Sequence, residues 1–185
     1  MTEQKNNCSF WKILLLDLLD FIKYIIITSV IVFIVTRFFF PLAVVPSGSM
    51  EDTLPSQSII IATKMSYWFD TPQRGDVVIF KRMETTGDNA YYVKRVVGVP
   101  GDTVEIKNGV TYINGVIYDE PWLKEQPAQE MFGPFEVPAG QYFCMGDNRN
   151  NSYDCRYWEE HFIDGNDILG KVKIVLSAQK MSFVK

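Results

Sequence analysis

Hydrophobic residues are arranged differently in the first forty positions than in the rest of the chain. Residues 1–20 mix apolar and charged side chains at helical spacing, which is typical of an amphipathic helix. Residues 21–40 are almost entirely apolar, and their charged side chains, Lys23 and Arg37, lie near the two ends. At about 1.5 Å per residue, such a run is long enough to cross a hydrocarbon layer of about 30 Å. The pattern therefore predicts a short amphipathic N-terminus over 1–20 and one transmembrane helix over 21–40.

Two other interpretations of this apolar run stay open. A secretory signal peptide has a similar composition, although this run is longer than usual and the small residue after it, Ala43, stands among bulky neighbours. A helix buried in a soluble core is the other alternative. The basic residues Lys5, Lys12 and Lys23 come before most of the run. Because basic residues concentrate on the cytoplasmic side, we expect a cytoplasmic N-terminus and an external body.

After residue 40 the pattern changes to short runs of β-branched and aromatic residues separated by turn-forming residues, which is typical of strands. Asn108-Gly109 and Asn114-Gly115 separate neighbouring runs, and Asn-Gly is a strong hairpin signal because both residues tolerate positive φ. The stretch 119–140 is interrupted by prolines, so we expect a loop. The sequence therefore predicts a mainly β fold of antiparallel sheets over 41–185. The predicted strands cover residues 58–62, 76–80, 91–98, 104–106, 110–113, 116–118, 141–145 and 171–176.

An aromatic group, Tyr67, Trp68 and Phe69, follows the first predicted strand. We expect these rings to pack into the core. The alternative is an aromatic anchor at the surface of a bilayer, where such rings are enriched.

The composition narrows the classes of function. With 47% hydrophobic residues in a chain of 185, there is enough apolar bulk for a core. A net charge of −4 gives no sign of a nucleic-acid partner. The cysteines Cys8, Cys144 and Cys155 and the histidine His161 lack the spacing of metal ligands, so we expect neither a metal nor another cofactor. Whether Cys144 and Cys155 form a disulfide stays open at this point.

The segment Pro46-Ser47-Gly48-Ser49-Met50 comes soon after the apolar run. Glycine lets the backbone turn tightly and come close to a ligand, while the proline fixes the approach. Ser49 is therefore the candidate nucleophile, held near the surface of the bilayer. The alternative is an ordinary polar linker that leaves a membrane helix.

A lysine inside an apolar strand is the candidate base. Lys94 lies between Val93 and Val96 in the predicted strand 91–98. Burial of an ammonium group lowers its pKa, so that a neutral amine becomes available to accept a proton. In the alternative interpretation Lys94 points to solvent and Arg95 is the covered residue.

Charged residues of both signs gather in the stretch 145–158, directly after a predicted strand. Asp147 and Asp154 lie close in sequence to Arg149 and Arg156. This pattern predicts a loop held rigid by internal ion pairs and hydrogen bonds. A hydrated loop without such contacts is the alternative.

Four segments together make the chain resemble the type I signal peptidases, membrane-bound serine proteases that remove signal peptides from exported proteins. The segments occur in the order of that family, at residues 46–54, 74–80, 92–102 and 146–158. The resemblance covers the apolar run and most of the remaining chain. It implies an antiparallel β domain of the signal-peptidase type, with an apolar surface that rests on the membrane.

The resemblance also implies roles for particular residues. Ser49 matches the nucleophile and Lys94 the general base of a Ser/Lys dyad, which needs no histidine. Ser47 matches a residue whose hydroxyl joins the Ser49 backbone N–H in the oxyanion hole. Ser152 matches a serine that hydrogen-bonds the lysine. Three further residues match the supporting loop of ion pairs: Asp147, Asp154 and Arg156.

By the same resemblance, residues 41–185 are expected to be the extracytoplasmic catalytic domain of a single-pass cell-membrane protein. Its partners would be the lipid bilayer and the signal peptides of secreted pre-proteins, cut after small residues at positions −3 and −1 through an acyl-enzyme. Two rival functions are a membrane-tethered binding module with an inert site and a self-cleaving repressor-type protease. The second also uses a serine and a lysine, but it carries a DNA-binding domain and no membrane span.

Overall fold

The computed structural model describes residues 2–38, 41–84, 86–178 and 181–184. The chain forms two compact units, residues 1–39 and 40–185. The outer ends of the predicted N-terminal segments, Met1 and residues 39–40, lie outside the described residues.

The first unit is a single α-helix, α1 (Thr2–Phe38). Its segment Leu14–Thr36 is long and apolar enough, by length and composition, to cross a membrane. This segment begins earlier than the predicted residue 21, and the helix has no break there. Asp20 and Lys23 lie one turn apart and pair at 2.8 Å, so these charges do not end the helix. The predicted amphipathic character of 1–20 stays a prediction, because the side chains up to residue 13 lie outside the described part.

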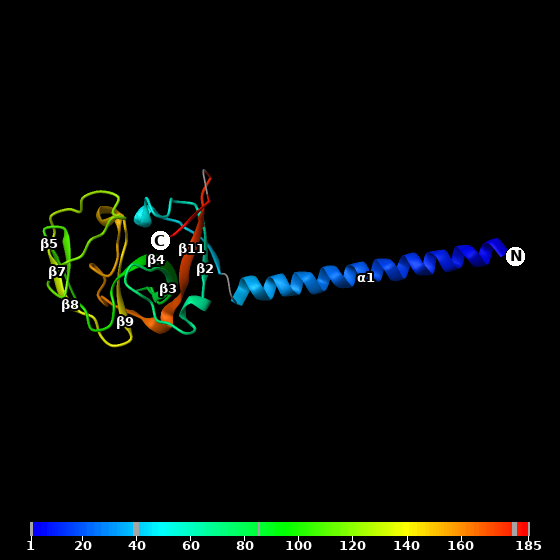
Figure 1. Ribbon diagram of the computed structural model, residues 1–185, viewed down its shortest axis with the longest axis horizontal. Coiled ribbons are helices and arrows are strands. Elements are labelled where there is room, and N and C mark those ends of the chain that lie inside the picture. The colour runs from blue at the N-terminus through cyan, green and yellow to red at the C-terminus, as the bar shows by residue number, and fades with distance from the viewer. Residues whose placement is uncertain (1, 39–40, 85, 179–180, 185) are drawn as a thin grey trace. The chain divides into compact units, whose positions relative to one another are not determined.

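The second unit contains two antiparallel sheets, which confirms the predicted mainly β fold (Figure 1). The larger sheet has the strand order β1-β2-β11-β3-β4-β9-β10, and β12 pairs with β11. Its strands are β1 (Leu42–Val44), β2 (Ile59–Thr63), β3 (Val77–Met83), β4 (Asn89–Gly98), β9 (Gln141–Met145), β10 (Ile163–Asp164), β11 (Ile168–Leu176) and β12 (Met181–Phe183). The smaller sheet has the order β7-β6-β5-β8. Its strands are β5 (Thr103–Lys107), β6 (Val110–Ile113), β7 (Val116–Ile117) and β8 (Phe132–Glu136). Short 3-10 helices lie between strands: η1 (Gly48–Met50), η2 (Met65–Tyr67), η3 (Arg149–Asn151) and η4 (Gly165–Asp167).

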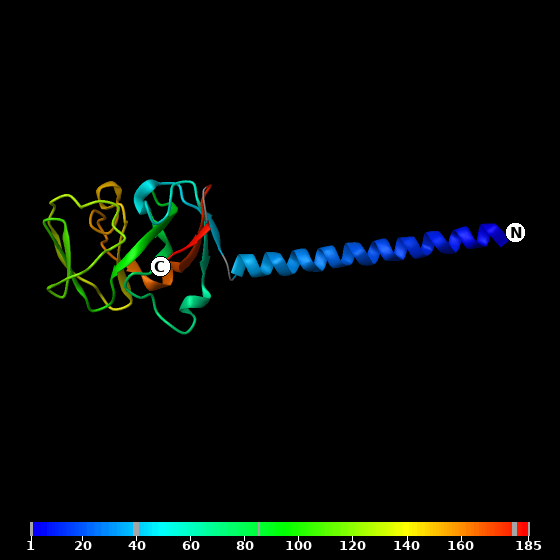
Figure 2. The same ribbon diagram turned by 45° about the horizontal axis from the view of Figure 1, so that its top comes forward.

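The smaller sheet is an insertion between two neighbouring strands of the larger one. The chain passes from β4 into β5, and from β8 back to β9, which pairs with β4. Figure 1 shows β5, β7 and β8 on the opposite side of the unit from β2, and the turned view of Figure 2 keeps this separation. The two ends of the insertion lie side by side, since the Gly101 N–H donates to the Val137 carbonyl at 3.0 Å.

Two apolar clusters cover the two faces of the larger sheet, as the alternation along β3 shows. Val77 and Ile79 belong to one cluster, and Val78 and Phe80 belong to the other. Successive side chains of a strand point to opposite faces, so β3 is buried on both. This explains why its sequence is a continuous apolar run rather than an alternating one.

The predicted hairpins are confirmed. Asn108 and Gly109 have φ of 52° and 78°, and Asn114 and Gly115 have φ of 52° and 79°. These values place both pairs in the left-handed region that two-residue hairpin turns require. The turns join β5 to β6 and β6 to β7.

The prediction of a loop over 119–140 is wrong for β8. Pro134 lies inside this strand and has no N–H to donate. Within the part of the chain that the structure describes, β8 is an edge strand that pairs with β5 alone, and an edge tolerates a missing donor. The pairing also shifts register at this point, between Val104 and Ile106.

The expectation that Tyr67, Trp68 and Phe69 pack into the core is wrong for two of the three. Trp68 is 53% exposed and Phe69 is 97% exposed. Tyr67 is partly buried because it packs against the apolar cluster that contains Val78 and Phe80, and its hydroxyl donates to Asp76 at 2.9 Å. The alternative, an aromatic anchor at a bilayer, stays a prediction for the two exposed rings.

Cys144 and Cys155 are both buried and both carry free thiols. The Cys144 backbone N–H donates to the Cys155 sulfur at 3.2 Å. Burial raises the pKa of both thiols well above the ordinary value, so neither is a reactive thiolate. The pair therefore acts as ordinary core packing in this structure.

Candidate active site

Ser49 lies in η1, the short helix that follows β1. The first N–H groups of a helix have no acceptor within the helix and are free to bind other groups. The loop after β9 supports this turn, because Asn148 donates from its backbone to the Ser49 carbonyl at 3.1 Å and from its side chain to the Gly48 carbonyl at 2.9 Å. Gly146 permits this close approach, since a Cβ there would lie 2.5 Å from the Ser49 carbonyl oxygen. A loop about 100 residues later in the chain thus fixes the candidate nucleophile.

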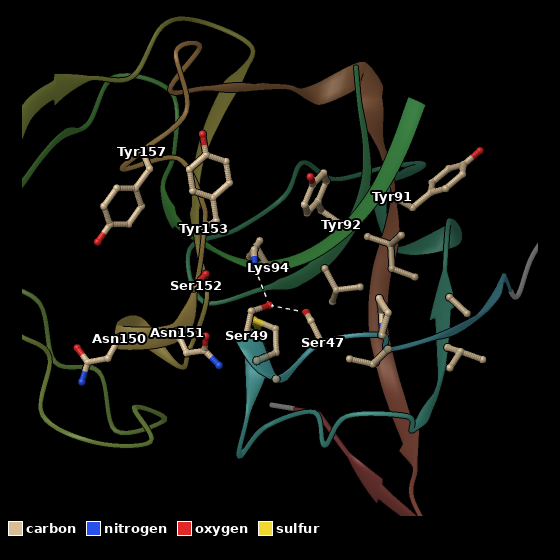
Figure 3. Close-up of a pocket in the computed structure, with 18 residues that line it drawn as sticks. Ser47, Ser49, Tyr91, Tyr92, Lys94, Asn150, Asn151, Ser152, Tyr153 and Tyr157 are labelled. Carbon is tan, nitrogen blue, oxygen red and sulfur yellow. Dashed lines mark hydrogen bonds between the residues drawn. The ribbon is translucent and has the colours of Figure 1, made fainter. Parts of the chain in front are cut away.

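Lys94 reaches from β4 to Ser49, with its Nζ 2.6 Å from the Ser49 Oγ (Figure 3). The lysine is only 3% exposed, and its strand, β4, lies in the interior of the sheet between β3 and β9. Burial lowers the pKa of Lys94 to about 8. The negative charge of Asp154 opposes this decrease, and the positive charge of Arg156 lowers the pKa further. The interpretation in which Lys94 faces solvent is therefore wrong.

Ser47 lies on the other side of the same hydroxyl. Its Oγ donates to the Ser49 Oγ at 3.3 Å, and Figure 3 shows the Ser49 hydroxyl contacting both Lys94 and Ser47. Unlike Ser49, Ser47 is exposed. The two serines of the Ser-Gly-Ser segment therefore converge on one point of the cavity.

The residue after Lys94, Arg95, is also buried and binds Asp147. Its Nε and Nη2 donate to the two carboxylate oxygens at 2.9 and 2.7 Å. The Thr53 hydroxyl donates to the same carboxylate at 2.5 Å. Asp147 thus joins its loop to β4 and to the segment after η1. The predicted pairing of Asp147 with an arginine of its own loop is wrong, because Asp147 follows Met145 closely and Met145 lies opposite Arg95 in the sheet.

Asp154 and Arg156 form the predicted ion pair within the loop. Arg156 donates through Nε and Nη2 to the two oxygens of Asp154 at 2.9 and 3.0 Å. The Gly146 N–H and the Ser152 hydroxyl donate to the same carboxylate at 2.9 and 2.7 Å. Burial alone would raise the pKa of Asp154, but the hydrogen bonds and charge of Arg156, aided by the other donors, hold it below its ordinary value. Asp154 therefore stays ionised close to Lys94.

The structure gives Ser152 a different partner from the one that the resemblance implies. Its hydroxyl donates to Asp154, and the hydrogen bond to Lys94 is not formed between these two described side chains. An ionised carboxylate is the stronger acceptor for the single proton of a hydroxyl. Ser152 still lines the cavity beside Lys94.

Sequence reasoning missed the residues of the insertion that hold this loop. Arg149 donates from its two terminal nitrogens to the two oxygens of Glu120, with one of the contacts at 2.9 Å, and also to the Thr111 hydroxyl at 3.2 Å. The ring of Trp122 lies under the Arg95 guanidinium, 4.2 Å from centroid to carbon. The one sequence signal that could have indicated the contact between Glu120 and Arg149 is their opposite charge. Because they are 29 residues apart, the sequence gives no reason to pair these two residues rather than others.

We expect Glu120→Gln to destabilise the fold strongly. Both side chains of the Glu120–Arg149 pair are less than 5% exposed. Removing one partner of a buried ion pair leaves the other charge uncompensated, at a cost of about 3–5 kcal/mol. Denaturant unfolding of the purified protein measures this loss. The double variant Glu120→Leu/Arg149→Met is the matched control and should recover most of it, because an apolar pair needs no compensation.

The four serine and lysine side chains of the proposed site, Ser47, Ser49, Lys94 and Ser152, line one cavity of about 700 Å³. A hydroxyl beside a buried amine of lowered pKa can become a nucleophile when the neutral amine takes its proton. Within the described residues, there is no group of three or more His, Cys, Asp or Glu side chains that could hold a metal ion. That the site works without metal or cofactor stays a prediction.

Comparisons with known proteins identify relatives of this chain. The family described as signal peptidase, peptidase S26, matches residues 18–177. The chain is 40% identical over 149 residues to a probable signal peptidase I-2 of Synechocystis sp. (strain ATCC 27184 / PCC 6803 / Kazusa), covering 78% of this chain and 67% of that protein. It is 39% identical over 150 residues to signal peptidase I S of Bacillus subtilis (strain 168), covering 76% of this chain and 79% of that protein. The crystal structure of a signal peptidase I from Enterococcus faecalis V583 is 30% identical, with a TM-score of 0.45, and the match covers 55% of this chain and 97% of that one.

Proposed function

This chain belongs to the signal peptidase family, peptidase S26, and we propose that it cleaves signal peptides from exported pre-proteins with Ser49 as nucleophile and Lys94 as general base. It is a peptidase of the signal peptidase I type. The observation that carries the assignment of residues is the contact of 2.6 Å between a buried lysine amine and a serine hydroxyl at the cavity.

The chemistry follows from the protonation state of Lys94. The neutral amine takes the proton of Ser49, and the Ser49 oxygen attacks the carbonyl carbon of the scissile peptide bond. The Lys94 ammonium then gives its proton to the leaving amine of the mature protein, which leaves an acyl-enzyme on Ser49. Lys94 next takes a proton from a water molecule, whose oxygen attacks the ester carbonyl. The Lys94 ammonium then returns this proton to the Ser49 oxygen as the signal peptide leaves with its new carboxylate, and both residues are restored. No histidine takes part in these steps.

The residues around the dyad hold it in place in this proposal. Asp154 keeps its negative charge because Arg156 and Ser152 donate to it. This charge raises the pKa of Lys94 and so offsets part of the decrease that burial causes. Asp147 anchors the same loop to β4 through Arg95. Ser152, Asp147, Asp154 and Arg156 are therefore positioning residues rather than reacting ones.

Ser47→Ala should lower kcat by about 10²-fold or more. In the proposed oxyanion hole the Ser47 hydroxyl and the Ser49 backbone N–H donate to the negative oxygen of the tetrahedral intermediate, and loss of one such donor costs about 3 kcal/mol. Ser47 is exposed, so its thermal unfolding midpoint should not change. Steady-state cleavage of a test pre-protein measures the effect, and Ser47→Thr, which keeps the hydroxyl, is the control. Near-normal turnover of the alanine variant would remove Ser47 from the mechanism.

The value of kcat/KM should fall as the pH drops below about 8. The active form carries a neutral Lys94, whose pKa is lowered by burial to about 8, so the active fraction decreases about tenfold per pH unit below that value and levels off above it. Asp154 stays ionised over the same range, because its pKa lies below the ordinary carboxyl value. The measurement is kcat/KM against pH with one stable pre-protein substrate. A flat profile between pH 6 and 8 would contradict the assignment of Lys94 as base.

The proposed substrates are pre-proteins with small residues at positions −3 and −1, as the resemblance implies. Aliphatic residues line another part of the cavity. Val44 lies three positions before Ser47, and Ile79 and Val93 lie opposite each other in the pairing of β3 with β4. Such a surface suits an apolar peptide that ends in small residues, because it offers shape and apolar contact rather than charge.

The relatives and the apolar helix indicate a membrane protein. We further propose that the part of α1 before the apolar segment Leu14–Thr36 lies in the cytoplasm, that this segment crosses the cell membrane once, and that the catalytic domain from residue 41 onward is extracytoplasmic. Lys5 and Lys12, which come before the apolar segment, and Lys23, which lies in its N-terminal half, support this orientation. Protease added outside intact cells should digest the domain and spare the N-terminus; the reverse pattern would overturn the orientation.

Two measurements on the full-length protein in detergent test the proposed function. The protein should cut a test pre-protein at its signal peptide, and a serine-directed acylating inhibitor should modify Ser49, as mass spectrometry of the digested protein would show. A membrane-tethered binding module with an inert site would bind the pre-protein, leave it intact and remain unlabelled.

A further inference from the structure

The wall of the cavity formed by residues 150–157 differs in chemistry from the aliphatic wall. It presents Asn150, Asn151, Tyr153 and Tyr157, which are exposed, rather than aliphatic side chains. Figure 3 shows Asn150, Tyr153 and Tyr157 on one side of Ser49 and Tyr91 on the other. The cavity therefore extends past the candidate nucleophile in two directions that offer different contacts to a peptide.

If the proposed function holds, this difference indicates in which direction the substrate peptide runs through the cavity. The segment before the scissile bond is apolar and fits the aliphatic wall. The scissile carbonyl must lie at the Ser49 Oγ, so the chain beyond it continues toward the opposite wall. We propose that residues 150–157 bind the first residues of the mature protein, and that Tyr153 favours an aromatic side chain among them.

Two aromatic rings of this wall are held in place before any substrate arrives. Tyr153 stacks on Tyr157 with centroids 6.0 Å apart and an angle of 18°, and its other neighbour, Trp158, meets it edge to face at 6.3 Å. The Tyr157 hydroxyl donates to Glu130 at 2.9 Å, and the Tyr157 ring packs edge to face with Phe132 at 5.1 Å. Tyr153 nevertheless remains 63% exposed. A ring that is both fixed and exposed can stack on a ligand without first losing conformational freedom.

Asn151 supplies the second contact of this subsite. The side chain of its neighbour Asn150 is already engaged, since it accepts from the Ala128 N–H at 2.8 Å and donates to Glu125 at 2.9 Å. The backbone N–H of Asn151 donates to the Asn148 carbonyl at 3.0 Å, but its side-chain carboxamide has no hydrogen-bond partner among the described residues. Asn151 lines the cavity together with Ser152. A carboxamide has both donors and an acceptor, so it can pair with the backbone of an extended peptide. Asn151 therefore suits the peptide backbone, while Tyr153 suits a side chain.

The test uses the full-length protein in detergent and four pre-protein substrates with the same signal peptide. One substrate has alanine at each of the first three mature positions, and each of the others has phenylalanine at one of them. For every enzyme variant, the measured quantity is the ratio of kcat/KM for a phenylalanine substrate to kcat/KM for the alanine substrate. We expect a ratio of about 3 to 10 at one position for the wild type, the range that aromatic pairs commonly give.

Tyr153→Ala should bring this ratio to about one, and Tyr153→Phe should preserve it because the ring is kept. Tyr91→Ala is the matched control, because Tyr91 is similarly exposed, at 67%, and lies on the other side of Ser49; it should leave the ratio unchanged. Each ratio is internal to one variant, so a partly unfolded preparation does not alter it. Normal cleavage with a wild-type ratio near one at all three positions, or a ratio that survives Tyr153→Ala, would overturn the subsite alone. Failure of the wild type to cut any of the four substrates would overturn the proposed function as well.

Discussion

Replacing Ser49 with alanine should reduce kcat by roughly 10⁴- to 10⁶-fold, the loss seen when a serine nucleophile is removed from a serine protease. In the proposed mechanism the Ser49 oxygen forms the acyl-enzyme, and no other hydroxyl can replace it. The Ser47 hydroxyl lies 3.3 Å from the Ser49 hydroxyl, but it is the Ser49 hydroxyl that the Lys94 amine contacts. The measurement is single-turnover cleavage of a pre-protein under excess enzyme, which separates a slow reaction from weak binding.

The stability of the Ser49→Ala variant provides its control. Alanine fits the same space, so the thermal unfolding midpoint should stay close to that of the wild type while the label from a serine-directed inhibitor disappears. Binding of the pre-protein should persist, because the cavity walls are unchanged. A variant that keeps more than a few per cent of wild-type kcat would show that the nucleophile lies elsewhere.

Lys94→Met should cause a loss of similar size for a different reason. Methionine has nearly the same length but no amine, so Ser49 keeps its proton and remains a weak nucleophile. The free energy of unfolding should be unchanged or higher, because the wild type has to bury an amine that is costly to desolvate, and methionine has no such cost. Activity and denaturant unfolding, measured on the same preparation, separate loss of chemistry from loss of structure.

Lys94→Arg is the more discriminating variant. Arginine can still donate to the Ser49 hydroxyl, but it remains protonated at every pH at which the protein is folded. If Lys94 acted only through its hydrogen bond, Lys94→Arg would retain a large part of the activity. If Lys94 is the base, this variant should be as inactive as Lys94→Met at all pH values.

The sequence predicted most of the strands and the burial of Lys94, because both depend on local chemistry. Asn108-Gly109 specified its hairpin through the backbone freedom of two residues, independently of any distant contact. Lys94 stood out because it and Arg95 are the charged residues of an otherwise apolar run, and burial of the second half of β4 follows from its composition. The contact of Lys94 with Ser49 did require the fold, since η1 and β4 are far apart in the chain.

Several features that the sequence did not predict depend on contacts between distant segments. Asp147 binds Arg95 of β4 rather than an arginine of its own loop, because strand pairing brings the two together. Glu120 binds Arg149 from a proline-rich stretch that has no periodic pattern. The strand β8 was hidden by Pro134, which only an edge position tolerates. For Asp147 and for β8 the deciding information was the sheet order, which local sequence patterns do not contain.

The insertion that carries the smaller sheet has a consequence for how members of this family can differ in size. Its two ends meet where Gly101 donates to Val137, so added or deleted residues beyond that junction need not move β4 or β9. Lengthening a flexible segment costs little, about 0.6 kcal/mol for each doubling of its length. We therefore expect homologues to vary in length within this stretch while the Ser49–Lys94 geometry is preserved. We expect the insertions of different length to keep an acidic residue at the position of Glu120, where it can pair with Arg149.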